Sequence, residues 1–376
     1  MRIILFTNSE EYGGAEKYLE DIFCYFSLQK DKEVFLLCSK PEIFIRLKNR
    51  DNKRIVLVKN KKIFYLGWFL TINPLYKAFK NINPDIILLN MPHSYCCEAA
   101  ILAAHKIVPK NRIVSIIHNP EISRAGGYPL IGILRNMTGR FFLKLIGTFI
   151  CPSNAGKDLF ATNFKVEPEK IRVIHNGIDI NTYGVPEKGM IIKEFKLHGK
   201  KIVLCVSRLV RRKGLEILIP AFKKVSAAIK DTVLLIVGEG YLKGDLENHV
   251  FKEDMSDTVI FTGFRQDVEK FYSDAAVVAV PSFYETLSYA VMEAMMFAKP
   301  IVATDIGGTH ELLADIGILV EAKDIESMSS AIINFLKNEA LANELGKKAR
   351  QRVLSYFSIS QFFREFEQTL DEISKN

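Results

Sequence analysis

The 376-residue chain lacks the apolar runs and cysteine patterns that mark several large protein classes. No stretch approaches the roughly 18 consecutive apolar residues that a membrane-spanning helix needs. The apolar start of the chain, up to Thr7, is too short for a signal peptide and predicts a first strand. Six cysteines lie scattered in apolar segments without a Cys-x-x-Cys pair, so zinc is not indicated and reduced core thiols of a cytoplasmic protein are predicted.

Two ligand-binding motifs are also missing. The residues from Glu11 to Glu16, which follow the first predicted strand, do not form Gly-x-Gly-x-x-Gly, and this argues against a Rossmann dehydrogenase. No Asp-x-Asp sequence occurs, so no bound divalent cation is expected. With 48% hydrophobic and 25% charged residues, the chain is predicted to be globular and long enough for two domains.

The net charge of +8 is concentrated in residues 51–150, which hold 14 Lys and Arg against 4 Asp and Glu. Within this region, aromatic residues are interleaved with basic ones at 61–70, 76–80 and 135–144. Such a combination suits a helix that lies on an anionic membrane surface. It equally suits a solvated face over ordinary core helices. No recognition motif accompanies the charge, so nucleic acid is not an expected partner.

Apolar runs alternate with amphipathic stretches along the chain, which is the pattern of doubly wound α/β domains. The predicted strands are Ile3–Thr7, Val34–Cys38, Ile86–Asn90, Ile113–His118, Phe149–Pro152, Lys201–Val206, Val233–Val237, Val259–Thr262, Ala275–Val280, Ile301–Thr304 and Ile318–Val320. Turn residues in 181–189 interrupt the alternation and predict a domain boundary there. We expect two Rossmann-like domains that face each other across a cleft, with ligands at the C-terminal ends of the strands.

The stretch from Pro281 to Met296 places two carboxylates eight positions apart. Glu285 follows an apolar strand in a predicted turn, and Glu293 lies inside the next predicted helix. Carboxylates accept hydrogen bonds from hydroxyls, and a helix N-terminus attracts phosphate. The combination suits a ligand that carries both groups, such as a sugar nucleotide.

Other strand ends carry groups of the same kind. Arg208 and Lys213 lie in a basic loop after a strand, where they are suited to bind one anion. Gly238 and Gly307 begin glycine-containing loops that allow either a close backbone approach to a ligand or a tight turn. His118 ends a strand, where a histidine is suited to bond a sugar hydroxyl or to transfer a proton, although an isolated histidine is often structural.

With these residues, the chain resembles the family 4 retaining glycosyltransferases of the GT-B fold over essentially its whole length. The spacing of Glu285 and Glu293 is similar to the paired-glutamate motif of that family. The segment 207–214 is similar to its diphosphate-binding loop, and 173–179 to its interdomain segment. Thr286 and Ser288 stand where the family usually has glycine, which bears on the identity of the donor sugar.

The resemblance implies a role for each candidate residue. Arg208 and Lys213 would hold the donor diphosphate, Glu293 the ribose and Glu285 the donor sugar. His118 would face that sugar, and the implied catalytic residues are His118, Glu285, Arg208 and Lys213. The further substrate- or nucleotide-binding residues would be Gly13, Gly14, Gly238, Thr286, Leu287 and Ser288, and the loop of Gly13 and Gly14 would lie near the phosphate and the acceptor.

The resemblance also implies the domains and the reaction. Residues 1–182 would form the acceptor domain, with a helix in 357–376 packing back on it, and residues 183–356 the donor domain. The expected reaction transfers a sugar from a nucleoside diphosphate sugar, with UDP expected over GDP as the nucleotide, to a hydroxyl of a glycan or lipid-linked glycan. The transfer is expected to retain the anomeric configuration, to need no metal ion, and to belong to lipopolysaccharide or capsule biosynthesis. The expected location is cytoplasmic, with peripheral contact at the inner face of the cell membrane. A GT-B-like nucleotide-sugar epimerase and a non-catalytic protein that binds nucleotide sugars or a membrane surface are the alternatives.

Overall fold

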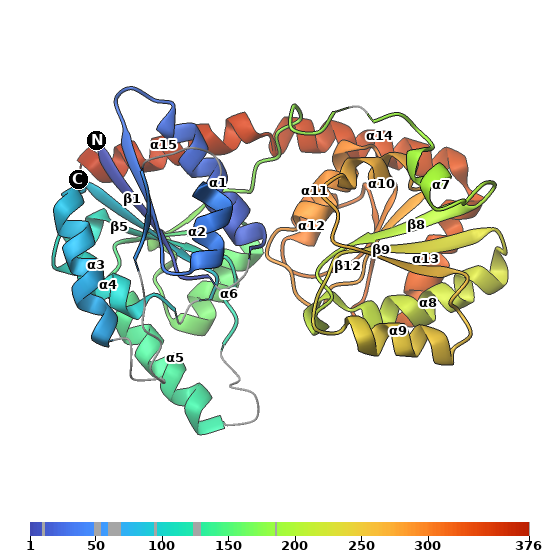
Figure 1. The fold of residues 1–376 in the computed structure, drawn as a ribbon, viewed down its shortest axis with the longest axis horizontal. Helices are drawn as coiled ribbons and strands as arrows, with labels where there is room; N and C mark the ends of the chain where they lie inside the picture. Colours follow the sequence, from blue (N-terminus) through green and yellow to red (C-terminus); the bar gives the residue numbers. More distant parts are fainter. Residues whose placement is uncertain are drawn as a thin grey trace. The chain divides into compact units, whose positions relative to one another are not determined.

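The chain forms two compact units, each built around its own parallel sheet (Figure 1). The computed structural model describes residues 1–9, 12–48, 54–58, 69–93, 96–122, 129–184 and 186–375. The first unit comprises Met1–Asn176 together with Phe362–Asn376, and the second comprises Gly177–Gln361. The domain limits predicted from the sequence, after residues 182 and 356, fall close to these divisions and stay a prediction.

The first unit contains a seven-stranded sheet in the order β3-β2-β1-β4-β5-β6-β7, with every pair parallel. Its strands are β1 (Arg2–Thr7), β2 (Glu33–Cys38), β3 (Ile55–Leu57), β4 (Ile86–Met91), β5 (Ile113–Ile117), β6 (Thr148–Cys151) and β7 (Ile171–Val173). Its helices are α1 (Gly14–Ser27), α2 (Pro41–Lys48), α3 (Phe69–Ile82), α4 (Glu98–His105), α5 (Pro129–Leu143), α6 (Asn154–Phe164) and most of α15 (Ile359–Lys375).

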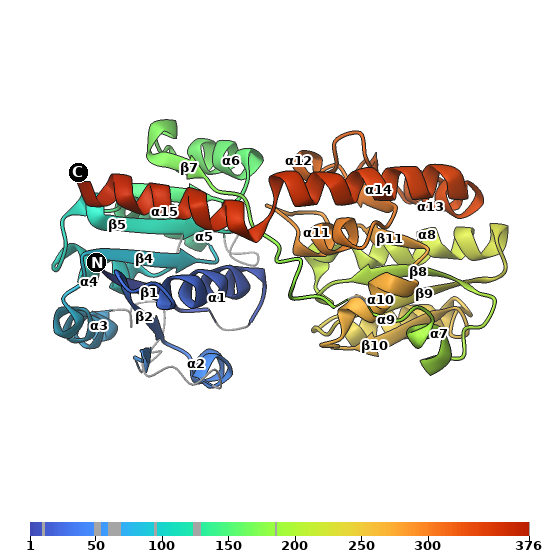
Figure 2. The ribbon, with the colours of Figure 1, turned by 90° about the horizontal axis from the view of Figure 1, so that it is seen from above.

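The last helix, α15, lies beside α1 in the first unit (Figure 2). Phe362 and Phe366 place their rings against the fully buried Tyr18 of α1, with ring centroids 4.8 and 6.4 Å apart respectively. Phe366 also contacts Phe26. Large buried aromatic side chains contribute strongly to core stability. The C-terminal residues are therefore part of the core of the first unit.

The second unit contains a six-stranded parallel sheet in the order β10-β9-β8-β11-β12-β13. Its strands are β8 (Lys201–Val206), β9 (Thr232–Val237), β10 (Val259–Gly263), β11 (Val277–Val280), β12 (Ile301–Thr304) and β13 (Ile318–Val320). Its helices are α7 (Met190–Glu194), α8 (Leu215–Ala228), α9 (Lys243–Lys252), α10 (Val268–Asp274), α11 (Tyr289–Met296), α12 (Thr309–Leu313), α13 (Ile325–Lys337) and α14 (Glu339–Tyr356).

Two separate hydrophobic cores cover the two faces of the second sheet. Alternate strand residues such as Leu204 and Val278 pack with α10, α11 and α14 on one face. Their neighbours Val203 and Val277 pack with α8, α9 and α13 on the other. Successive side chains of a strand point to opposite faces, so a sheet covered on both sides has continuous apolar strands. This explains why the apolar runs predicted these strands within one or two residues.

The structure differs from the sequence predictions in the basic N-terminal region. Strands β3 and β7 were not predicted. Phe79 and Phe142 belong to the segments in which aromatic and basic residues alternate, and both are buried in the core of the first unit rather than exposed to a membrane surface. Phe141 is exposed, and residues 61–68 lie outside the described part of the chain. Among the described residues, no helix is long and apolar enough to cross a membrane.

Candidate active site

The second sheet has a topological switch point between β8 and β11. The chain runs outward from β8 to β9 and β10, and then returns to β11 on the other side of β8. In open α/β sheets, ligands bind outside the carboxyl ends of the strands at such a point. The segment after β8 carries Arg208 and Lys213, and the segment after β11 carries Glu285. Three predicted site residues therefore lie where this fold is suited to bind a ligand.

Lys213 and Glu285 form a buried ion pair at this switch point. The ε-amino group of Lys213 contacts Oε1 of Glu285, and the two side chains are only 15% and 8% exposed. Ser282 donates a hydrogen bond of 3.0 Å to the same carboxylate oxygen. Burial alone would raise the pKa of Glu285, but Lys213 and Arg212 outweigh it and hold the pKa below its usual value. Glu285 is therefore a charged, oriented carboxylate.

Three glycines bring the loops at these strand ends into direct backbone contact. Gly307 packs against the carbonyl of Glu285, Gly214 against that of Pro281, and Gly238 against that of Ser207. A β-carbon at any of the three would collide with the carbonyl oxygen, and their φ angles of 48°, 67° and 141° are ones that other residues rarely adopt. Each glycine therefore lets one loop approach another, and the half-buried Arg208 directly follows one of these contacts.

Glu293 lies on α11, eight residues after Glu285, and binds two tyrosine hydroxyls. Tyr272 donates a hydrogen bond of 2.9 Å to Oε2, and Tyr183 donates one of 2.7 Å to Oε1. Burial is the main cause that raises the pKa of Tyr272 well above its usual value, and the nearby Glu293 adds to it. Tyr272 is therefore a neutral hydrogen-bond donor that orients Glu293.

The residues between the two glutamates are buried and have ordinary backbone angles. Thr286, Leu287 and Ser288 are all buried, and Ser288 precedes α11 with a φ of −85°. Neither Thr286 nor Ser288 has a positive φ. The backbone therefore does not require glycine at either position, and both side chains are accommodated without strain of this kind.

In the first unit, the loop before α1 is held by a buried carboxylate. Glu16 accepts a hydrogen bond of 2.9 Å from the backbone N–H of Gly13 and another from the hydroxyl of Ser9. Gly14 is the first residue of α1, and Glu16 lies in its first turn. This is the reciprocal half of a capping box, in which a glutamate satisfies the N–H that precedes a helix. The loop of Gly13 and Gly14 is thereby fixed relative to the end of β1.

His118 follows β5 and is tied to the neighbouring strand β4. Its backbone N–H donates to the carbonyl of Met91, and its Nε2 lies 2.7 Å from Oδ1 of Asn90. The ring of Tyr18 contacts the imidazole edge-on, at 5.2 Å between centroids. Burial lowers the pKa of His118 to about 3, so the imidazole is neutral at neutral pH. The sequence identified His118 but missed its partners.

The structure thus joins Lys213 directly to Glu285 and holds Glu293 on the following helix. It also links His118, through Asn90, to Ala15 beside the loop of Gly13 and Gly14. Two other histidines lie near strand ends or loops of the chain: His310 is exposed and pairs with Asp305 at 3.0 Å, and His175 is half-buried. The roles of all these residues stay predictions.

Sequence reasoning missed the polar residues that orient the candidate groups. They are Glu16, Asn90, Ser282, Tyr183 and Tyr272. One signal was available for Asn90 and Ser282, because each places a polar side chain at or just after the carboxyl end of an apolar strand. The tyrosines carried no comparable signal, because their partner is far away in the sequence.

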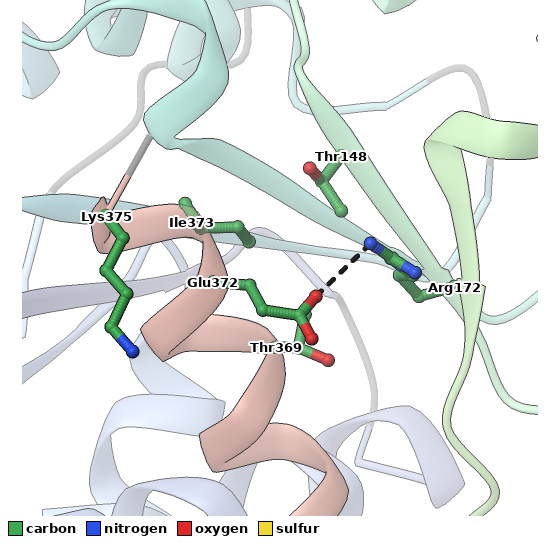
Figure 3. A pocket seen from close by; sticks show the side chains of 6 residues that line it. All are labelled: Thr148, Arg172, Thr369, Glu372, Ile373 and Lys375. Carbon is green, nitrogen blue, oxygen red and sulfur yellow. Dashed lines mark hydrogen bonds and ion pairs between the residues drawn. The ribbon is translucent and has the colours of Figure 1, made fainter.

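A hollow of about 430 Å³ lies elsewhere in the first unit, between the edge of its sheet and α15 (Figure 3). It is lined by Thr148, Arg172, Thr369, Glu372, Ile373 and Lys375. Arg172 and Glu372 form an ion pair of 3.2 Å across it, and both side chains are about half exposed. None of the predicted site residues lines this hollow, which we interpret as a gap left where α15 packs against the sheet.

In the described part of the chain, no group of three or more His, Cys, Asp and Glu side chains is placed to hold a metal ion.

Two family models match the chain and together account for most of its length. The model described as "Glycosyltransferase Family 4" matches residues 12–182, and "Glycosyl transferases group 1" matches residues 189–352. The first therefore contains Gly13, Gly14 and His118. The second contains Arg208, Lys213, Glu285 and Glu293.

Individual proteins of known activity are similar to the chain at lower identity. The chain is 28% identical over 318 residues to the UDP-Gal:alpha-D-GlcNAc-diphosphoundecaprenol alpha-1,3-galactosyltransferase of Escherichia coli, covering 82% of this chain and 78% of the relative. It is 26% identical over 291 residues to the N-acetyl-alpha-D-glucosaminyl L-malate synthase of Bacillus anthracis, covering 76% and 74%.

The fold is shared with solved glycosyltransferase structures. HepE of Anabaena in complex with UDP-glucose superimposes with a TM-score of 0.84 at 20% identity, over 99% of this chain and all of HepE. WaaG, a glycosyltransferase involved in lipopolysaccharide biosynthesis, gives a TM-score of 0.76 at 15% identity over the whole of both chains. Taken with the two family models and the two parallel sheets, these similarities show that the chain belongs to the family 4 glycosyltransferases and has the GT-B fold.

Proposed function

We propose that this glycosyltransferase moves a sugar from a UDP-sugar to a hydroxyl of a glycan or lipid-linked glycan, with retention of anomeric configuration and without a metal ion. The observation that carries the proposal is the buried Lys213–Glu285 pair at the switch point between β8 and β11. The donor and acceptor classes are supported by the galactosyltransferase relative, whose name specifies UDP-Gal and a diphosphoundecaprenol-linked sugar. The UDP-glucose complex of HepE gives further support for the donor.

The chemistry centres on the departing diphosphate. Cleavage of the bond between the sugar and the diphosphate places negative charge on the leaving group, and fixed cations stabilise that charge most when they are already in position. Arg208 and Lys213 lie on the segment after β8 and supply two such cations. The N-terminus of α11 follows Ser288 and adds the partial positive charge of a helix end.

Lys213 connects the diphosphate to the sugar in this proposal. Without a donor, its ammonium group neutralises Glu285. A bound diphosphate attracts the same ammonium group, and the Glu285 carboxylate then accepts hydrogen bonds from hydroxyls of the donor sugar. Ser282 keeps the carboxylate oriented during this exchange because it binds Oε1 at 3.0 Å. Glu293, held by Tyr272, accepts the ribose hydroxyls.

The proton of the acceptor hydroxyl also needs a destination. In the proposed mechanism the leaving phosphate takes this proton on the same face of the sugar from which it departs. The sugar is thus delivered with its anomeric configuration retained. His118 contacts the donor sugar and is not the base.

A screen of UDP-, GDP- and ADP-sugars for slow hydrolysis, with and without EDTA, tests the donor and the metal independence. NMR of the product from the active donor reports its anomeric configuration. Arg208→Ala and Lys213→Ala are each expected to lower turnover about a hundredfold, the cost of losing one preorganised charge contact. Arg211→Ala is the matched control, because Arg211 is an exposed cation of the same loop.

Three outcomes contradict this proposal. An isomerised nucleotide sugar formed without acceptor indicates an epimerase. Binding of UDP-sugars without hydrolysis or transfer to any acceptor indicates a binding protein. Unchanged turnover in both Arg208→Ala and Lys213→Ala removes these residues from the site.

We also propose peripheral contact of the first unit with an anionic membrane from the cytoplasmic side. On α5, Met137 and Phe141 are each 62% exposed, and Lys144 follows the helix. Exposed apolar side chains beside cations suit a surface of anionic lipids. The protein is expected to float with anionic liposomes at low salt and to be released as salt rises, because screening weakens the attraction. Failure to float at low salt favours a soluble acceptor.

A further inference from the structure

Asn90 is a fully buried amide in an otherwise apolar strand. It lies near the carboxyl end of β4, between Leu89 and Met91, and its side chain is not exposed to solvent. A buried amide is stable only if its donors and its acceptor find partners. The two partners found for this side chain, Ala15 and His118, belong to the two parts of the candidate site in the first unit.

The partner on α1 fixes which way the amide points. One end of the Asn90 side chain lies 3.3 Å from the backbone carbonyl oxygen of Ala15. A carbonyl oxygen can only accept a hydrogen bond, so the amide NH₂ group must face it. The amide oxygen, Oδ1, therefore points toward His118.

The orientation of the amide in turn determines the hydrogen on the imidazole. Nε2 of His118 lies 2.7 Å from Oδ1 of Asn90, and two bare acceptors at that distance would repel each other. Nε2 must therefore carry the hydrogen and donate it to Asn90. Burial keeps the imidazole neutral, so it has a single N–H, and the other ring nitrogen, Nδ1, is an acceptor.

The ring is also held in place by packing. Tyr18 is fully buried and meets the imidazole at an interplanar angle of 80°. The ring of Phe362 on α15 also packs against Tyr18, with 4.8 Å between the ring centroids. A rotation of the imidazole that exchanged its nitrogens would break the bond to Asn90 within this packed region.

We propose that Asn90 is a positioning residue that holds His118 in the Nε2–H tautomer and in one ring orientation during sugar transfer. The inference deepens the proposed function and rests on it for the role of His118 in the reaction.

The tautomer is measured directly in the full chain without any donor. Long-range ¹H–¹⁵N correlation spectra of ¹⁵N-histidine-labelled protein distinguish the two neutral tautomers, and His118→Gln identifies the signals that belong to His118 among the seven histidines. We expect the Nε2–H pattern in the wild type and a mixture of tautomers in Asn90→Ala. The Nδ1–H pattern in the wild type overturns the proposal, even if Asn90→Ala does not fold.

The kinetic consequence is measured with the nucleotide sugar that is turned over in the UDP-sugar screen. Asn90→Ala is expected to lower kcat about tenfold, the effect of one lost hydrogen bond, with little change in the donor KM. Ser115→Ala is the matched control, because Ser115 is a buried polar residue on the adjacent β5 that donates to the carbonyl of Leu89. A mixed tautomer with unchanged kcat overturns the role of Asn90. If no nucleotide sugar is turned over, the proposed function fails, and the spectra still decide the tautomer.

Discussion

The buried hydroxyl of Tyr272 donates a hydrogen bond of 2.9 Å to the carboxylate of Glu293. Tyr272 belongs to α10 and Glu293 to α11, so the bond joins two consecutive helices on the same face of the sheet. The ring of Tyr272 stacks on Phe297 at an interplanar angle of 7°. The carboxylate that we assign to the ribose is thus held by a rigid neighbour.

Removal of this hydroxyl is expected to weaken nucleotide binding. In Tyr272→Phe the ring still fills its place, but Glu293 loses one of its two tyrosine donors and keeps only that of Tyr183. We expect the dissociation constant of UDP to rise about tenfold, as for the loss of one hydrogen bond to a charged group. Isothermal titration calorimetry measures this effect. Tyr356→Phe, which removes an exposed hydroxyl on α14, serves as the control, and equal affinities in the two variants would contradict the role of Tyr272.

Single and double substitutions of the Lys213–Glu285 pair are expected to affect the stability and the activity of the protein differently. Lys213→Met leaves the buried Glu285 charge without its partner, and this costs about 3–5 kcal/mol in the free energy of unfolding. Adding Glu285→Gln removes the unpaired negative charge, so the double variant should recover most of that stability while remaining inactive. Urea unfolding and turnover assays on the single and double variants measure the two effects. If the double variant is as unstable as Lys213→Met, the unpaired Glu285 carboxylate is not the cause of the lost stability.

The pKa of His118 predicts a pH dependence of stability. Burial lowers it to about 3 from an ordinary value of 6.5, so between these pH values the unfolded chain binds a proton that the folded chain does not. Protonation therefore favours unfolding, and the free energy of unfolding should fall as the pH drops from 6.5 toward 3. His118→Gln should flatten this part of the profile in urea titrations at several pH values. His198→Gln, at an exposed histidine, should not change it.

The glycine contacts predict a paired experiment on backbone strain. Gly307 and Gly189 both have positive φ angles, 48° and 83°, but only Gly307 has a neighbour in the way of a side chain. Gly189→Ala should therefore cost about 1 kcal/mol of unfolding free energy through φ alone. Gly307→Ala should cost clearly more and should also reduce turnover, because the added methyl group displaces the backbone of Glu285. Equal costs in thermal unfolding would mean that the loops yield without penalty.

The fold was predictable because both sheets are parallel and covered on both faces. Strands in such sheets are continuous apolar runs, and β1, β4 and β8 were recognisable for this reason. Strands β3 and β7, each of three residues, were missed, whereas the equally short β13 was predicted. Three residues carry too little periodicity to separate a strand consistently from a loop.

The candidate site was predictable only in its ionisable residues. Glu285, Lys213 and His118 follow apolar strands, and the sequence shows that order directly. The supporting contacts depend on residues that the fold alone brings together. Tyr183 reaches Glu293 across 110 positions, and Asn90 reaches His118 across 28. The glycines illustrate the same limit, since their partners are other loops rather than a ligand.

The discontinuous first unit has a consequence for the synthesis of the protein. The segment Phe362–Asn376 belongs to the same unit as Met1–Asn176, but it is synthesised only after the whole second unit, Gly177–Gln361. Until then Tyr18 and Phe26 lack the rings of Phe362 and Phe366 that cover them. The nascent first unit must therefore wait, with part of its core uncovered, while the whole second unit is translated. The second unit is contiguous, so it can complete its own folding first, and a premature stop near residue 360 would harm the half of the molecule that was made earliest.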